Sequence, residues 1–229
     1  MILVVGNTKG GVGKSAFAVN IAAVLAGQGK DVLLIDGDEQ ASAATFAAIR
    51  AELPQVKASF TTVQLQGAAI RQQARQLRDK YDEIVIDVGG RDTGSLRAAL
   101  TVADTLLVPV QPRSVDLWAV AKQMAELVGE AREINPDLRA LSVLNAADSQ
   151  GRDNDDAAGA LRAISGIEFL PCVVVRRKAF PNAFSEGLSV IEQSPKDQKA
   201  VDELLSVVNS LYTQKVGNGY QNATKRAAS

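Results

Sequence analysis

Three residues near the start of the chain, Gly13, Lys14 and Ser15, have the types and the order needed to bind a phosphate chain. They close the stretch NTKGGVGKSA, residues 7–16, which matches the end of the pattern G-x-x-x-x-G-K-[ST]. A glycine-rich loop that opens a helix directs main-chain N–H groups and the positive helix terminus at one point. Lys14 would then lie against the β- and γ-phosphates, and the Ser15 hydroxyl would bind Mg²⁺. The stretch predicts a nucleotide site rather than a simple tight turn.

Carboxylates follow two later apolar runs of the chain. VLLIDGDEQ puts Asp36 and Asp38 at the end of one run, and EIVIDVGG puts Asp87 at the end of another. Ligands of open α/β sheets bind beyond the carboxyl ends of the strands, so we expect the glycine loop and these acids to converge. A single Asp at a strand end is more often a helix cap or a turn residue. The joint pattern favours a magnesium site formed by Ser15, Asp36 and Asp87.

Short apolar runs alternate with helical patterns along the whole chain. Runs typical of strands buried on both faces are ILVVG, VLLID, EIVIDV, DTLLVPV, ALSVLN and EFLPCVVV. One helix face follows the glycine loop, at Phe17, Ile21, Val24 and Leu25, and another spans residues 201–211, at Val201, Leu204, Leu205, Val208 and Leu211. This alternation predicts an α/β fold, with a mostly parallel twisted sheet and helices on both faces.

Composition limits the possible classes of protein. A chain of 229 residues with 46% hydrophobic content can bury one sizeable core, so we expect one domain over residues 1–212. Residues 213–229 lack periodicity and are predicted to form a flexible, basic polar tail. A net charge of −1 excludes a global attraction to nucleic acid or to an anionic membrane. The N-terminal apolar run is too short for a signal peptide, and no segment approaches the roughly 20 apolar residues of a membrane span.

Two residue types are scarce or absent, and this narrows the chemistry. The chain has no histidine, which excludes the most usual general base and histidine-bound zinc. Its single cysteine, Cys172, excludes an intramolecular disulfide, suits a reducing cytoplasm and is predicted to be a buried strand residue. Without an obvious strong base, slow hydrolysis of a nucleotide fits a timing switch better than a metabolic engine.

Several of these motifs together resemble the ParA/MinD family of ATPases. KGGVGKS is similar to the family's deviant Walker A motif, DGDEQ to its D-x-D-P-Q segment and IVIDVGG to its Walker B motif. The similarity continues through ALTVADTLLVPVQPRSVDL and reaches VVVRRKAF and GLSVIEQSP, so it covers about residues 1–211. The resemblance implies a P-loop NTPase fold of the SIMIBI type, with ATP and Mg²⁺ as cofactors and a slow, partner-stimulated ATPase activity.

The resemblance also implies roles for individual residues. Lys9 would reach across a dimer interface to the partner's ATP, although a loop lysine can also serve its own nucleotide or meet only solvent. Together with Lys14 and Lys9, Asp38 would be catalytic, since it would position the attacking water. The implied nucleotide contacts are Lys9, Gly10, Gly11, Val12, Gly13, Lys14, Ser15, Ala16, Gln111, Pro112 and Asn145. Ala16 in place of a threonine and Glu39 in place of a proline bear on affinity and rate rather than on the existence of the site.

Three cellular roles are compatible with such an ATPase. It could act on a DNA surface, act at a membrane surface as MinD does, or have a metabolic or electron-transfer role. An iron–sulfur dimer needs several cysteines, and the chain has one. The tail lacks the apolar stripe of a membrane-binding amphipathic helix. A DNA role is therefore favoured. The expected non-specific contacts are Arg176, Arg177, Lys178, Lys196 and Lys199, although a basic triplet is usually just a solvated turn.

The first strand begins at once, without room for an N-terminal helix-turn-helix, so the chain resembles the small ParA-type partition proteins. The resemblance implies an ATP-dependent homodimer that is cytoplasmic, associates with the nucleoid and does not bind membranes. It would segregate plasmid or chromosomal DNA with a centromere-binding adaptor of the ParB type. The alternative is a ParA-like ATPase that positions another cargo, such as a chemoreceptor array or a protein compartment. The sequence leaves open which cargo it is and whether dimers assemble further.

Overall fold

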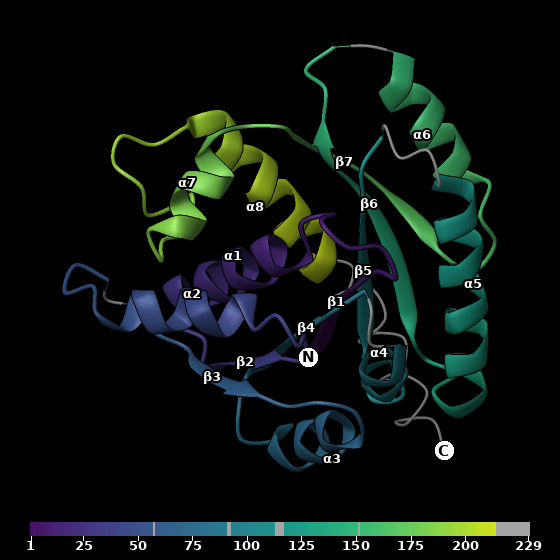
Figure 1. The fold of residues 1–229 in the computed structure, drawn as a ribbon, viewed down its shortest axis with the longest axis horizontal. Coiled ribbons are helices and arrows are strands. Elements are labelled where there is room, and N and C mark those ends of the chain that lie inside the picture. The colour runs from purple at the N-terminus through teal and green to yellow at the C-terminus, as the bar shows by residue number, and fades with distance from the viewer. Residues whose placement is uncertain (57, 91–92, 113–116, 151, 214–229) are drawn as a thin grey trace, which may run out of the picture.

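The computed structural model describes residues 1–56, 58–90, 93–112, 117–150 and 152–213 (Figure 1). Its centre is a seven-stranded sheet in the order β3-β2-β4-β1-β5-β6-β7, in which all the described strand pairs are parallel. The strands are β1 (Ile2–Gly6), β2 (Val32–Asp36), β3 (Thr61–Gln64), β4 (Glu83–Val88), β5 (Thr105–Val110), β6 (Arg139–Ala147) and β7 (Glu168–Val175). The helices are α1 (Lys14–Gly27), α2 (Ser42–Ala51), α3 (Ala68–Leu77), α4 (Thr93–Leu100), α5 (Leu117–Ile134), α6 (Arg152–Arg162), α7 (Ala179–Ser185) and α8 (Gln198–Thr213).

Helices cover both faces of this sheet (Figure 1). Helices α1, α2, α7 and α8 pack on one face, where their apolar side chains form a core with Leu3 and Val5 of β1. Helices α3, α4, α5 and α6 pack on the other face, against Ile2 and Val4. Successive residues of a strand point to opposite faces, so a strand that is apolar at every position must be covered on both sides. The predicted α/β fold with a parallel sheet between two helical layers is confirmed.

Helix α1 is buried on more than the one face that its sequence pattern predicts. It lies between the sheet and helices α2, α7 and α8, and its residues from Phe17 to Leu25 are all buried. Each fully buried residue of the size of Ile21 or Leu25 contributes about 1.5–3 kcal/mol to stability. The helix that begins at the glycine loop is therefore among the best anchored elements of the domain.

The two edge strands differ from the expectations. Strand β3 has the polar sequence TTVQ and was not predicted, because it has no apolar run. The prediction that β7 is buried on both faces is wrong, since Pro171 and Val173 are exposed while the residues between and beside them face α8. Strand β7 is at the edge of the sheet and pairs with β6 alone among the described strands. The helices cover the face of β7 that carries Pro171 and Val173 less completely than the face that packs against α8. Cys172 is buried, as predicted.

On the predicted face of α8, the last described helix, Val201, Leu204, Val208 and Leu211 are buried and Leu205 is partly buried. Val207, which was not predicted, is buried as well. The predicted tail lies, from residue 214 onward, outside the described residues. Within the part of the chain that the structure describes, no helix is both long and apolar enough to cross a membrane.

Candidate nucleotide-binding site

The site forms where the central strand β1 ends. Strand β1 pairs with β4 on one side and with β5 on the other, and the chain runs from β1 through the glycine loop into α1. Parallel strands end at the same edge of the sheet, so the segments that follow β2, β4, β5, β6 and β7 surround this loop. This is the edge at which open α/β sheets bind ligands.

The glycine loop has a main-chain shape that other residues would not adopt easily. Gly11 and Gly13 have φ angles of 72° and 94°, in the left-handed region, and α1 begins directly after Gly13. A Cβ atom at Gly13 would overlap the side-chain amide of Asn145. Both the backbone conformation and the available space therefore require glycine at position 13.

Side chains from two neighbouring strands hold the carbonyl groups of this loop. Gln111 Nε2 donates a hydrogen bond of 2.9 Å to Gly11 O, and Asn145 Nδ2 donates one of 2.7 Å to Val12 O. Both residues were predicted as nucleotide contacts, and both also line the cavity described below. The loop is thus fixed with its carbonyls turned toward the protein, which leaves N–H groups for an anion.

A buried asparagine and the two lysines complete the loop. Asn7 donates to Pro109 O (2.8 Å) and accepts a hydrogen bond from Lys9 N (3.0 Å). Lys14 Nζ donates to Lys9 O (3.0 Å), so the main chain of Lys9 is held on both sides. Burial lowers the pKa of Lys14, while the charges of Asp87 and Asp38 oppose that shift. Asn7 was not predicted, although a polar residue that ends an apolar strand beside a glycine loop is a usable signal.

Asp38 and Asp87 lie near residues of the loop, as expected, whereas the contacts of the Asp36 side chain are with the turn that follows β2. Asp36 and Asp87 are direct register partners in β2 and β4. Asp36 Oδ1 accepts from Asp38 N (3.0 Å), and Asp36 Oδ2 accepts from Ala44 N (2.8 Å), so this carboxylate shapes the turn from β2 into α2. Burial raises the pKa of Asp36. Asp38 is half-buried on that turn, and its Oδ1 accepts a hydrogen bond from Gln40 N (3.0 Å).

Asp87 is suited to a cation. It is fully buried, and among the described residues neither of its carboxylate oxygens has a hydrogen-bond partner of ordinary geometry. Burial raises its pKa to about 7, against the opposing effects of the Ser15 hydroxyl and the Lys14 charge. A buried carboxylate that lacks well-formed hydrogen bonds is costly unless it is protonated or bound to a cation. The residues present therefore fit a hydrated Mg²⁺ next to Ser15.

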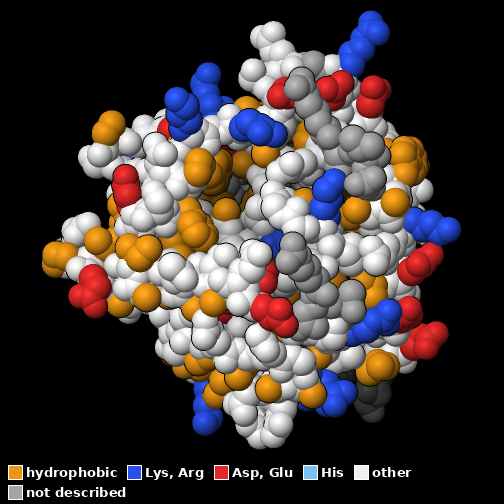
Figure 2. All heavy atoms as spheres, viewed as in Figure 1, with side chains coloured by type: hydrophobic (Ala, Val, Ile, Leu, Met, Phe, Trp, Pro, Cys, Tyr) orange, Lys and Arg blue, Asp and Glu red, His pale blue; other side chains and the backbone are white. Residues whose placement is uncertain are grey.

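A cavity of about 830 Å³ opens from the glycine loop toward α7. Predicted residues that line it are Gly10, Gly11, Gly13, Lys14, Ser15, Ala16, Asp38, Gln111 and Asn145. Other predicted residues do not line it within the described part of the chain: Lys9, Val12, Asp36, Asp87 and Pro112. The apolar wall of the cavity was not predicted as part of the site and consists of Phe17 of α1, Phe180, Pro181 and Phe184 of α7, and Leu204 of α8. Figure 2 shows this hollow with hydrophobic side chains along one side of it.

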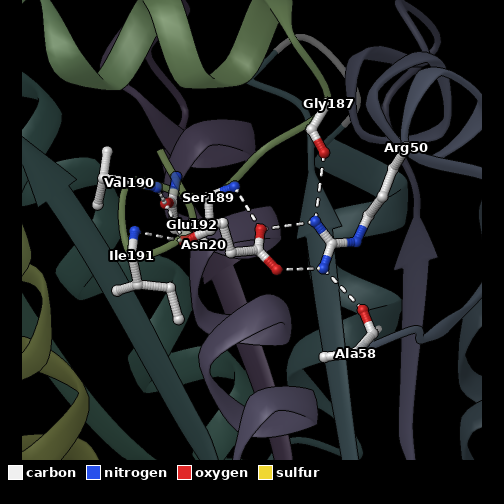
Figure 3. A network of polar contacts seen from close by, with 8 residues as sticks. All are labelled: Asn20, Arg50, Ala58, Gly187, Ser189, Val190, Ile191 and Glu192. Carbon is white, nitrogen blue, oxygen red and sulfur yellow. Dashed lines mark hydrogen bonds and ion pairs between the residues drawn. The ribbon is translucent and has the colours of Figure 1, made fainter. Parts of the chain in front are cut away.

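A buried ion pair anchors the segment that follows this apolar wall (Figure 3). Arg50 of α2 is 5% exposed, and its guanidinium donates to both carboxylate oxygens of Glu192 at 2.7 Å. The same guanidinium donates to Gly187 O (3.2 Å) and Ala58 O (2.7 Å). Because Gly187 lies two residues after the end of α7, the pair fixes the end of the helix whose aromatic residues face the cavity.

The same segment is also tied to α1 through Asn20 (Figure 3). Asn20 is fully buried, and its Oδ1 accepts from Ser189 Oγ (2.7 Å) and Val190 N (3.0 Å). Its Nδ2 donates to Ala16 O (2.7 Å) in the turn that follows the glycine loop. The two sides of the cavity are therefore joined through buried hydrogen bonds. Sequence reasoning missed this network because its members are far apart along the chain.

The predicted DNA-contacting residues divide into two groups. Arg177 pairs with Glu203 of α8 (2.6 Å) and approaches Asp197 (4.0 Å), which neutralise its charge. Arg176, Lys178, Lys196 and Lys199 are exposed, and Figure 2 shows Lys and Arg side chains gathered above the hollow. Arg176 and Arg177 also line the cavity, so the basic segment borders the nucleotide site.

A glycine loop between a central parallel strand and a helix, with a buried acid at the end of the neighbouring strand, defines a P-loop nucleotide-binding protein. Residues 3–190 match the model of the CobQ/CobB/MinD/ParA nucleotide binding domain, and the chain belongs to this family. The resemblance to the ParA/MinD ATPases that the sequence motifs carry is confirmed.

The chain is similar to proteins named for carboxysome distribution, chromosome partitioning and plasmid partition. It is 28% identical over 215 residues to the maintenance of carboxysome distribution protein A of Halothiobacillus neapolitanus, spanning 91% of this chain and 95% of that protein. It is 32% identical over 218 residues to the chromosome-partitioning ATPase Soj of Thermus thermophilus, spanning 82% and 86%. A plasmid partition protein of Borrelia burgdorferi, solved with AMPPNP, has the same fold, with a TM-score of 0.71, 18% identity and coverage of 93% and 98%.

Proposed function

We propose that this chain is a Mg²⁺-dependent ATPase that dimerises on ATP, binds DNA without sequence preference and releases it after hydrolysis. In this way it would segregate a plasmid or chromosome with a centromere-binding adaptor of the ParB type. The observation that carries the proposal is the grouping of Lys14, Ser15, Asp38 and Asp87 around the glycine loop at one edge of the sheet.

Each of these residues has a distinct part in the proposed reaction. The N–H groups of the loop and the Lys14 ammonium bind the β- and γ-phosphates, and the base and sugar occupy the cavity toward α7. Ser15 and Asp87 would hold Mg²⁺, with Asp36 supporting the turn beside them. When bound, the metal would neutralise charge that develops on the phosphates. Asp38 orients the attacking water at the end of the cavity where the loop and the β2–α2 turn meet.

Lys9 is proposed to act on the nucleotide of a second subunit. Its main chain is held by Asn7 and Lys14, and within the described residues Lys9 is not among those that line the cavity of its own chain. Two nucleotides that face each other in a dimer bring several negative charges together, and a lysine from each subunit would offset that repulsion. ATP would therefore stabilise the dimer.

The cross-subunit role can be tested by light scattering with ATP and Mg²⁺. Lys9→Ala should bind ATP with near wild-type affinity but should not form the dimer, whereas Asp38→Ala should bind, dimerise and fail to hydrolyse. Lys30→Ala, which removes an exposed lysine at the opposite edge of the sheet, is the matched control. A Lys9→Ala protein that dimerises as well as the control contradicts the proposed role.

The proposed DNA surface consists of the exposed residues Arg176, Lys178, Lys196 and Lys199, present twice in a dimer, so that weak phosphate contacts add together. The test replaces Arg176 and Lys178, which lie two positions apart in the basic segment that follows β7. Binding should need ATP, ignore sequence and weaken steeply with salt. Replacing both residues by alanine removes up to four contacts per dimer and should reduce the salt slope by about 3 to 4. The double variant Arg71→Ala/Arg75→Ala, on exposed positions of α3, is the control with equal charge loss.

Retention on random-sequence duplex DNA, with ATP and with ADP, decides this part of the proposal. Equal binding with both nucleotides would separate DNA binding from the ATPase cycle. Undiminished binding by the Arg176/Lys178 variant would assign the DNA surface to other residues. Binding to anionic vesicles with no binding to DNA would favour a membrane-surface ATPase of the MinD type.

A second candidate function is the positioning of a cargo other than DNA, with the nucleoid still serving as the surface. The observation that favours it is the similarity, over 95% of its length, to the maintenance of carboxysome distribution protein A. The two functions differ in the adaptor rather than in the ATPase. Recovery of the adaptor on the immobilised Asp38→Ala protein with ATP distinguishes them: a centromere-binding protein supports partition, and a protein of another assembly supports the alternative.

A further inference from the structure

Two adjacent glycines, Gly89 and Gly90, directly follow β4. They lie in close contact with the segments that carry Asp38 and Lys9. A Cβ atom on Gly89 would stand 2.6 Å from both Cγ and Oδ2 of Asp38. A Cβ atom on Gly90 would stand 2.7 Å from Thr8 O and 2.9 Å from the carbonyl carbon of Lys9. Side chains do not approach other heavy atoms so closely, because packed atoms repel below their contact distance. Each position thus admits a larger residue only if the facing group moves.

The close approach follows from the geometry of the sheet. Strands β2 and β4 are neighbours, with Asp36 in register with Asp87, and the ladder continues one step through a hydrogen bond from Gly37 N to Asp87 O (2.7 Å). Neighbouring strands are about 4.8 Å apart, so the segments that leave them stay in contact. Asp38 therefore comes to lie over Gly89.

The groups that face the two glycines differ in how easily they can move. Asp38 is a half-buried side chain at the rim of the cavity, so an added methyl group at position 89 can be accommodated by a turn of its carboxylate away from the site. The groups that face Gly90 are main-chain atoms of the glycine loop, which hydrogen bonds hold on both sides of Lys9. A methyl group at position 90 can be accommodated only by a shift of the loop itself.

We propose that Gly89 and Gly90 are positioning residues for two separate steps: Gly89 sets the place of the Asp38 carboxylate for hydrolysis, and Gly90 sets the place of the glycine loop for nucleotide binding. This inference rests on the proposed function, since it takes the roles of Asp38 and of the loop from it.

Adjacent Gly→Ala substitutions should therefore have different effects. Gly89→Ala should bind ATP with wild-type affinity in calorimetry and lose about a hundredfold in kcat, the usual effect of misplacing a catalytic group by about 1 Å. Gly90→Ala should bind ATP about tenfold or more weakly. Gly27→Ala, where a Cβ atom meets nothing within 4 Å, should change neither quantity. Equal losses of affinity in the Gly89 and Gly90 variants would overturn the separation of the two steps.

A double-mutant cycle tests whether Gly89 acts through Asp38. Because Asp38→Ala should not hydrolyse ATP, the cycle is followed through the Tm. Gly89→Ala should lower the Tm of the wild-type protein but not that of Asp38→Ala, in which the carboxylate that would collide is absent. An equal loss of Tm in both backgrounds would overturn the inference. Hydrolysis retained by Gly89→Ala but lost by Asp38→Ala refutes the inference alone, whereas hydrolysis retained by Asp38→Ala refutes the proposed role of Asp38 and the inference with it.

Discussion

The buried pair between Arg50 and Glu192 gives the sharpest prediction about stability. Among the described residues, Glu192→Ala leaves the Arg50 guanidinium, 5% exposed, with the carbonyl groups of Gly187 and Ala58 as its hydrogen-bond acceptors. It also removes the acceptor of Ser189 N, which donates to Glu192 Oε2 at 2.8 Å. Removing one partner of a buried ion pair costs about 3–5 kcal/mol, because the other charge stays buried without compensation.

The expected loss lies at the lower end of that range, about 3 kcal/mol, because the Glu192 side chain is 19% exposed and Arg50 keeps both carbonyl groups. For a chain of this size, that loss lowers the Tm by roughly 6–12 °C. Urea unfolding followed by circular dichroism measures the change directly. Glu130→Ala is the matched control, because Glu130 pairs with Arg97 but both side chains are 52% exposed, and such pairs contribute about 0–1 kcal/mol. A Glu192→Ala protein as stable as the Glu130→Ala control would refute the assignment of a structural role to this network.

Three further predictions concern the nucleotide site. Lys14→Ala removes the cation that opens α1 but leaves the loop main chain, so calorimetry with ATP and Mg²⁺ should detect no binding; unchanged affinity would refute the P-loop assignment. Asp87 has its pKa raised from 3.8 to about 7 in the folded protein, so the folded state holds its proton more tightly than the unfolded chain does. Wild-type stability without Mg²⁺, relative to Asp87→Asn, should therefore fall as pH rises between these values and stay constant above about pH 7; a pH-independent difference in urea unfolding would contradict the shift. Asn145→Ala removes the hydrogen bond to Val12 O and should weaken ATP binding by roughly fivefold to tenfold, since such a bond is worth about 1 kcal/mol or slightly more; equal affinity would mean that the loop keeps its shape without it.

The chemistry of the site could be predicted because it is encoded in short, local patterns. A glycine loop followed by Lys14 and Ser15 needs its particular backbone shape whatever surrounds it, and an Asp at the end of an apolar run indicates a strand end. The rule that parallel strands end at one edge then brings Asp38 and Asp87 beside the loop. Strand β3 escaped this reasoning because a short polar edge strand carries no local pattern.

Contacts between distant segments could not be predicted in the same way. Arg50 and Glu192 are 142 residues apart, and neither residue type indicates a buried position by itself. Arg177 belongs to a basic triplet that suggests a free DNA-binding surface, yet Glu203, 26 residues later, neutralises it. Whether a charged side chain is exposed depends on what packs against it, which is a property of the assembled domain.

The amino-acid sequence by itself determined the fold class, the glycine loop, the acids expected beside it and the resemblance to the ParA/MinD ATPases. These features depend on periodicity and on residues a few positions apart, so they can be recognised without knowledge of how the side chains pack. Only the tertiary structure decided that Asp38 lies over Gly89, that α7 forms an apolar wall and that Arg177 is not free. Each of these depends on which strands are neighbours and how closely their ends approach, because the close contact of packed side chains is set by the whole fold.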